Sequence, residues 1–137
     1  MLTEFTLTPL KVIQHPQGDV YRALRADEAS YKQFGEAYFS TIKQNEIKGW
    51  KKHREVTLNI VVPVGKIIFV LYSKESNQFS KIELSVQNYQ RLTVPPGWWM
   101  AFKGVETTNL LLNVTDRVHD SNEAEKCDIN EIHYIWK

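Results

Sequence analysis

The chain has 137 residues and a formal net charge of +1, so no overall field favours nucleic acid or an anionic membrane surface as a partner. Its 42% hydrophobic and 24% charged residues exclude disorder, and the length is that of one domain, residues 1–137. Cys127 is the single cysteine, which excludes an internal disulfide. Residues 1–10 lack a basic start followed by an apolar run, and the longest apolar stretch is strand-sized, so we expect neither a signal peptide nor a membrane span. We therefore expect a cytoplasmic protein.

The first half of the chain predicts strands. The polar segment 27–34 is the best candidate for a helix, one or two turns long, and residues 36–42 predict a strand because they are aromatic and β-branched. Residues 56–64 alternate strictly, which indicates one buried face. After a turn at Gly65, residues 66–72 form an almost continuously apolar strand.

The second half continues in the same way. Shorter strands are predicted at 81–85, 91–94 and 109–114, and a last one at 133–136 that would cover a sheet edge. Pro95-Pro96-Gly97 is a turn, with a fixed φ at its start and a glycine at its end. Many short strands separated by turn signals indicate an all-β sandwich or barrel.

Charge is distributed unevenly along these strands. Residues 43–55 carry five basic and two acidic side chains, and residues 116–131 carry six acidic and two basic ones. The two stretches are either solvated faces, or the basic one meets an anionic ligand such as a diphosphate.

Two segments match the frame of the metal-binding cupin motifs but lack the ligands. In those motifs a His-x-His pair and a Glu, followed by a Gly six residues later, converge with a His that follows a Pro-x-Gly turn, because alternate side chains point into the barrel. Here Lys51 and His53 take the places of the pair, Leu58 that of the Glu, and Met100 that of the last His, while Gly65 keeps the spacing. One histidine among Leu and Met cannot hold a divalent metal, so we expect no metal and no other cofactor.

Three segments resemble the nucleotide-sugar cupins. Lys48-Gly49-Trp50-Lys51-Lys52-His53, within residues 46–53, is similar to the Leu-Arg-Gly-Leu-His segment of the dTDP-4-dehydrorhamnose 3,5-epimerases and to the Gly-Gly-His-x-His of the dTDP-4-keto-6-deoxyglucose 3,4-ketoisomerases. Residues 88–98 resemble the segment that leads into an Ile-Pro-Pro-Gly turn in both enzyme groups. Residues 112–116 resemble the epimerases' Thr-Asp strand, and residues 135–136 resemble their C-terminal tryptophan. The resemblance covers residue 35 to the C-terminus, and 18–21 more weakly. It implies an all-β, single cupin-type barrel (a double-stranded β-helix or jelly roll).

The same resemblance shows departures at the catalytic positions. Lys51 stands where the epimerases have their catalytic base and the ketoisomerases their first histidine, whereas His53 corresponds to the ketoisomerases' second histidine. Arg117-Val118-His119 replaces the epimerases' tyrosine after Thr-Asp, and Lys48 replaces a guanidinium. The fold carries over to this chain, and the reaction does not carry over automatically.

Epimerisation beside a ketone needs a base, an acid on the opposite face, and a cation or donor for the enolate oxygen. Lys51 is a candidate base if burial lowers its pKa, and His53, two residues along on the same face, could share that role or polarise the carbonyl. Tyr89 is the candidate acid, with Tyr38 and Tyr72 as alternatives. In the alternative, non-catalytic interpretation, Lys51 and His53 point into solvent and Tyr72 belongs to the core.

The candidate substrate-binding residues are the cations and aromatics near these positions: Lys48, Arg91, Tyr38, Trp50 and Trp98. Trp98 and Trp99 cannot both face inward, because adjacent strand residues point to opposite faces.

These observations favour an isomerase acting on a nucleotide-linked 4-keto-6-deoxysugar, in deoxysugar or surface polysaccharide biosynthesis, that binds the nucleotide sugar as a homodimer. The alternatives are a cupin that binds a nucleotide sugar or carbohydrate without catalysis, and a structural partner of a sugar-biosynthetic enzyme.

Overall fold

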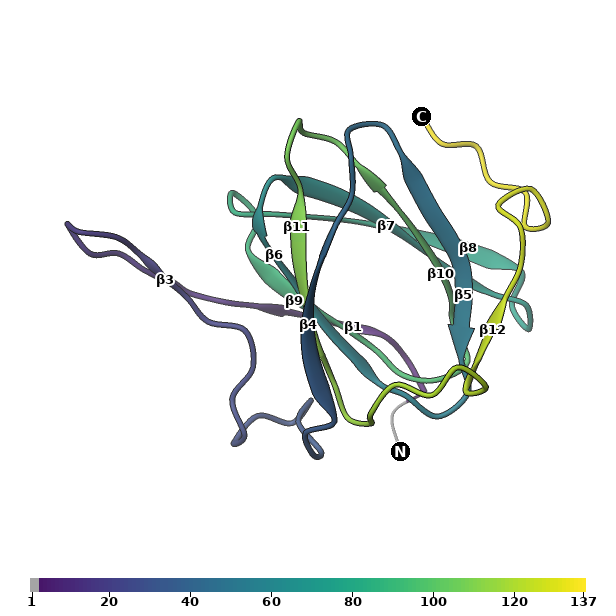
Figure 1. Cartoon of the computed structure of the whole chain (residues 1–137), viewed down its shortest axis with the longest axis horizontal. Coiled ribbons are helices and arrows are strands. Elements are labelled where there is room, and N and C mark those ends of the chain that lie inside the picture. The colour runs from purple at the N-terminus through teal and green to yellow at the C-terminus, as the bar shows by residue number, and fades with distance from the viewer. Residues whose placement is uncertain (1–2) are drawn as a thin grey trace.

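Two antiparallel five-stranded sheets face each other in the computed structural model, which describes residues 3–137 (Figure 1). The first sheet has the order β1-β9-β6-β11-β4 and the second the order β12-β5-β10-β7-β8. The strands of the first sheet are β1 (Thr6–Pro9), β4 (Glu36–Thr41), β6 (Leu58–Val64), β9 (Gln90–Val94) and β11 (Leu110–Thr115). Those of the second are β5 (Ile47–His53), β7 (Lys66–Ser73), β8 (Gln78–Ser85), β10 (Trp99–Gly104) and β12 (Ala124–Lys126).

The remaining two strands, β2 (Val12–Ile13) and β3 (Val20–Tyr21), form a hairpin that projects from the body of the molecule (Figure 1). Two facing sheets with crossing connections are a jelly roll, so the predicted all-β, cupin-type fold is confirmed.

The main core fills the space between the sheets. The alternation is confirmed for residues 56–62, because Val56, Leu58, Ile60 and Val62 belong to this core and are at most 5% exposed. It is wrong at Val64, which is 43% exposed beyond an irregularity in the pairing with β11, and the other face of β6 is buried too, at Asn59 and Val61. Ile67, Phe69 and Leu71 of β7 and Leu92 and Val94 of β9 pack against them.

A second, smaller core lies on the outer face of the β5-β10-β7 sheet. Trp50, Val70, Trp99 and Ala101 are buried there, and Ile132 of the C-terminal segment covers them. This cover explains why β7 is apolar at nearly every position, since both of its faces are buried.

Two sequence predictions about local structure are wrong. Residues 27–34 form turns and irregular chain, because Glu28 and Ser30 are bound by the guanidinium of Arg91 instead of facing solvent from a helix. Residues 133–136 form no strand: Trp136 packs at a tilt against Trp50, Tyr134 packs edge-on against Trp136, and the edge strand is β12.

Strands β5 and β12 were not predicted from the sequence, because neither has an alternating apolar pattern of its own; both are defined by their pairing with neighbouring strands. Strand β5 carries three lysines and a bulge, and β12 has only three residues. Between residues 3 and 137 the structure has no helix long and apolar enough to cross a membrane.

Candidate functional site

A pocket of about 230 Å³ is lined by residues of both sheets. Its walls come from five strands and combine polar groups from β4, β5 and β11 with apolar ones from β6, β10 and β11. The lining residues are Tyr38, Ser40, Lys48, Gly49, Lys51, His53, Leu58, Ile60, Met100, Phe102, Leu111 and Asn113.

The four positions aligned with cupin metal ligands converge on this pocket. Lys51, His53, Leu58 and Met100 all line it, although they come from three strands. The spacing of the cupin motifs therefore locates the pocket correctly, but the side chains at these four positions are not those of a metal site. Within residues 3–137 no three His, Cys, Asp or Glu side chains are grouped so that they could hold a metal ion.

A bulge in β5 brings two lysines to the same face. Met100 pairs with Lys51 and Phe102 with Lys48, so three residues along β5 span the distance of two along β10. Gly49 sits in this bulge with φ +152°, and a Cβ on it would lie 2.4 Å from the Cβ of Ala101. Only glycine fits there without displacing β10.

Lys48 spans the gap between β5 and β4. Its Nζ donates to the carbonyl oxygen of Thr41 at 2.6 Å and lies 3.5 Å from the hydroxyl of Ser40. The ammonium also lies 6.0 Å from the centre of the Phe102 ring. Lys48 is thus a fixed cation at the rim of the pocket.

Lys51, unlike Lys48, has no partner for its amine in the described part of the chain. Its side chain is partly buried, and among the described residues no hydrogen bond or ion pair reaches its Nζ within the usual distances. Burial, and then the charge of Lys126 on the facing strand, lower the pKa of Lys51, with Glu123 opposing them. The amine is therefore more easily deprotonated than an ordinary lysine.

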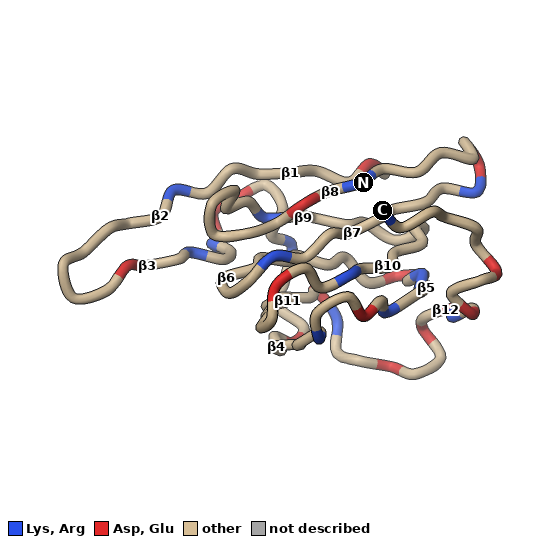
Figure 2. The backbone as a smooth tube through the Cα atoms, turned by 90° about the horizontal axis from the view of Figure 1, so that it is seen from above, with Lys and Arg blue, Asp and Glu red and all other residues tan. Residues whose placement is uncertain are grey.

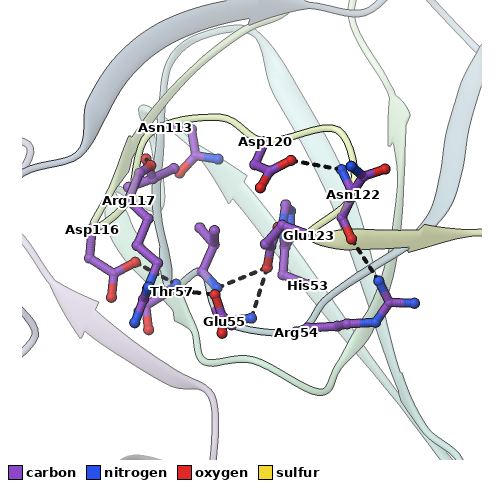
Figure 3. A network of polar contacts seen from close by, with 12 residues as sticks. His53, Arg54, Glu55, Thr57, Asn113, Asp116, Arg117, Asp120, Asn122 and Glu123 are labelled. Atoms are coloured by element: carbon purple, nitrogen blue, oxygen red, sulfur yellow. Dashed lines mark hydrogen bonds and ion pairs between the residues drawn. The ribbon is translucent and has the colours of Figure 1, made fainter.

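His53 is oriented by a carboxylate from a distant part of the chain (Figure 3). Its Nδ1 lies 2.6 Å from Oε1 of Glu123, and Oε2 of Glu123 accepts from the backbone N–H groups of Glu55 and Val56 at 2.8 and 3.0 Å. Burial raises the pKa of Glu123, but these hydrogen bonds together with the imidazole outweigh it and hold the pKa at about 2. Since Nδ1 is used by Glu123, Nε2 is the nitrogen left for the pocket.

Tyr38 faces the lysines from β4. Its hydroxyl oxygen accepts from Nδ2 of Asn113 at 2.9 Å, so its own proton is free to point into the pocket. Burial raises the pKa of Tyr38, which keeps the phenol protonated.

Other predicted site residues lie away from the pocket. The hydroxyl of Tyr89 donates to the carbonyl of Arg22 at 2.7 Å, and burial raises its pKa to about 12. Arg91 is 1% exposed and binds Glu28 at 2.7 Å, which ties residues 23–30 to β9. Both side chains have structural partners, and neither lines the pocket.

The tryptophans are also separate from it. Trp50 is 1% exposed in the outer core, on the opposite side of β5 from Lys51. Trp98 packs edge-on against Phe5 and lines a different, larger groove of about 1140 Å³. Trp98 contacts the inner core and Trp99 the outer one, which confirms that the two point to opposite faces.

The basic and acidic stretches of the sequence meet in space. Lys52 pairs with Glu125 at 2.8 Å, and Arg54 is 3.7 Å from the same carboxylate. Figure 2 shows the basic residues of β5 and the acidic residues near β12 on the same side of the molecule. Lys52 and Arg54 thus share the carboxylate of Glu125, and Lys48 and Lys51 are the cations of this stretch that line the pocket.

Sequence reasoning missed Glu123 and Asn113. The acidic run 116–131 was the signal for Glu123, but nothing in it distinguishes one acid from its neighbours. Asn113 follows the inward alternation of β11 after Leu111, which could have placed it in the pocket.

Neither a protein-family profile nor a curated protein sequence matches the chain, but solved structures do. A dTDP sugar isomerase from Desulfovibrio desulfuricans is 33% identical, with a TM-score of 0.89 over 93% of this chain and 86% of that one. The dTDP-4-dehydrorhamnose 3,5-epimerase of Sulfolobus tokodaii is 19% identical, with a TM-score of 0.83 over 97% and 82%. The sugar 3,4-ketoisomerase QdtA of Thermoanaerobacterium thermosaccharolyticum, solved with TDP, is 16% identical, with a TM-score of 0.80 over 96% and 93%.

Proposed function

This chain belongs to the family of cupin-fold dTDP-sugar isomerases, and we propose that it isomerises a nucleotide-linked 4-keto-6-deoxysugar by moving a proton on a carbon next to the ketone. One observation carries the proposal: the His53–Glu123 pair lies at the wall of a pocket that also holds an amine and a phenol. A base, an acid and a positive group are what enolisation requires.

His53 is the base in this proposal. The anionic Glu123 accepts the Nδ1 proton of the imidazole and stabilises the imidazolium that forms when Nε2 takes a proton from the sugar. Tyr38, which lines the pocket from another strand, is the acid that returns a proton to the sugar carbon. Tyr38 thereby takes the role that the sequence suggested for Tyr89.

The size of the pocket suits one sugar ring. Its 230 Å³ is below the roughly 300 Å³ at which pockets begin to enclose drug-sized ligands, so the nucleotide would lie outside. Lys48 at the rim and Lys126 on β12 are cations for the diphosphate, and QdtA, which shares the fold, was solved with TDP. The reaction would serve deoxysugar or surface polysaccharide synthesis in the cytoplasm.

A homodimer is part of the proposal. The β2–β3 hairpin projects away from the body of the molecule, and Val20 and Tyr21 on it are 49% and 36% exposed. A second copy would bury these side chains. Light scattering at micromolar concentration should give about twice the 16.0 kDa chain mass, and a monomer would contradict this part.

Solvent-deuterium exchange tests the function. Incubated with TDP-4-keto-6-deoxyglucose in heavy water, the protein should place deuterium on the carbons beside the ketone, because abstraction leaves this trace even when no epimer accumulates. Binding of the nucleotide sugar without exchange would favour the alternative, a binding cupin that has lost catalysis. If the protein neither binds nor exchanges, the proposed substrate is wrong.

A further inference from the structure

Lys51 has the surroundings of a nucleophilic amine. Its side chain lines a pocket whose other walls include Leu58, Ile60 and Met100, and no acceptor within residues 3–137 holds its Nζ by a hydrogen bond or an ion pair. By contrast, the ammonium of Lys48 is held by its hydrogen bond to the Thr41 carbonyl at 2.6 Å. An unpaired, partly buried lysine is the kind that forms Schiff bases with carbonyl substrates.

We propose that Lys51 forms a Schiff base with the ketone of the sugar, and that His53 abstracts the neighbouring proton from this iminium. The inference rests on the proposed function, since it takes a 4-keto sugar as the substrate. It extends that function from electrostatic stabilisation of an enolate to covalent activation.

The steps balance without any further reactant. The lone pair of Nζ attacks C4, the carbonyl π pair moves to oxygen, and proton transfer from nitrogen to oxygen gives a carbinolamine. The hydroxyl takes one proton from solvent and leaves as water, which breaks the C4–O bond and leaves C4=N⁺; the final hydrolysis returns this proton to solvent. Abstraction of a proton from C3 or C5 by Nε2 of His53 gives a neutral enamine. Return of a proton to the same carbon, followed by addition of water to C4, releases the ketone and free Lys51.

The electrostatics of the pocket fit this order. Burial and Lys126 lower the pKa of Lys51, which increases the share of neutral amine that can attack. The iminium then carries a positive charge, which favours the nearby carboxylate of Glu123, since this group binds His53 and its charge acts on Lys51. The positive nitrogen acidifies the neighbouring C–H more strongly than a neutral carbonyl does.

The covalent step has a consequence for specificity. While nitrogen is attached to C4, a proton can be lost and regained at C3 or C5, so the configuration there can invert. The keto group cannot move from C4 to C3, because the nitrogen would remain on C4 as an amine. The inference therefore assigns epimerisation, and not ketone transfer, to this chain.

Borohydride trapping is the first test. Protein incubated with TDP-4-keto-6-deoxyglucose and sodium cyanoborohydride should gain the mass of one reduced sugar nucleotide, on the peptide that contains Lys51. Lys51→Arg keeps the charge and should gain no mass. Lys52→Ala is the matched control, because Lys52 is the next residue, pairs with Glu125, and lies on the other face of the strand; it should be labelled like the wild type. Labelling of Lys51→Arg would overturn the inference.

Isotope exchange in the unmodified protein is the second test and needs no variant. Each Schiff-base cycle replaces the ketone oxygen with one from solvent, so in ¹⁸O water the wild type should accelerate ¹⁸O uptake by tenfold or more over buffer. Deuterium exchange without trapping and without accelerated ¹⁸O uptake would overturn the Schiff base and leave the proposed function intact. Trapping without deuterium exchange would support the Schiff base and overturn the proposed proton transfer. Absence of all three signals would overturn both.

Discussion

Replacing Glu123 with glutamine should destabilise the protein strongly, although the substitution keeps the shape of the side chain and removes only its charge. The carboxylate accepts from Glu55 N, Val56 N and His53 Nδ1, and its side chain is 8% exposed. A fall of the pKa from its ordinary 4.5 to about 2 corresponds to about 3 kcal/mol of folding free energy at neutral pH. We therefore expect Glu123→Gln to lower the urea midpoint at pH 7 by about 1–2 M.

The pH dependence gives the sign of the effect. Because the pKa of Glu123 is lower in the folded than in the unfolded protein, its stabilisation is fully present above the unfolded value of 4.5 and is lost as the pH falls toward 2. The difference between wild type and Glu123→Gln should thus shrink by about half at pH 3. Glu125→Gln is the control, since this exposed carboxylate pairs with Lys52 and Arg54 at the surface and should change the midpoint little. An equal difference at pH 7 and pH 3, or none at pH 7, would refute the reasoning.

Three further predictions concern the pocket and its support. Gly49→Ala should cost about 2 kcal/mol in urea unfolding, because its Cβ would overlap Ala101; an unchanged midpoint would mean that β5 and β10 can separate freely. Tyr38→Phe should retain deuterium exchange while lowering formation of the epimer by about a hundredfold, and equal losses of both would contradict its role as the acid. Arg91→Ala should cost about 3 kcal/mol by removing the ion pair with Glu28, without changing the catalytic rate per folded molecule; a lower rate in fully folded protein would mean that Arg91 belongs to the site.

The fold was accessible from the sequence because its signals are local. The alternation of residues 56–64 and the turns at Gly65 and Gly97 each depend on a few neighbouring residues, and they predict the facing strands correctly. The spacing between these signals was enough to bring Leu58 and Met100 to the same pocket as His53.

The polar part of the site depends on contacts that no local pattern encodes. Glu123 reaches His53 across seventy positions of sequence, and its role follows from the approach of the segment before β12 to β5. Tyr38 and Tyr89 are equivalent as sequence signals; one lies inside the barrel on β4, and the other is bound to the backbone of Arg22. Trp50 lies in the outer core because adjacent strand residues point to opposite faces, and its neighbour Lys51 points into the pocket.

The most direct test of the central claim compares binding and proton exchange in His53→Asn. The substitution removes the base, while the cations proposed for the diphosphate, Lys48 and Lys126, remain. We expect the dissociation constant for TDP to stay within about threefold of the wild type, and deuterium exchange into TDP-4-keto-6-deoxyglucose to fall by about a hundredfold or more. Exchange at the wild-type rate in a folded His53→Asn protein would contradict the assignment of His53 as the base of this pocket.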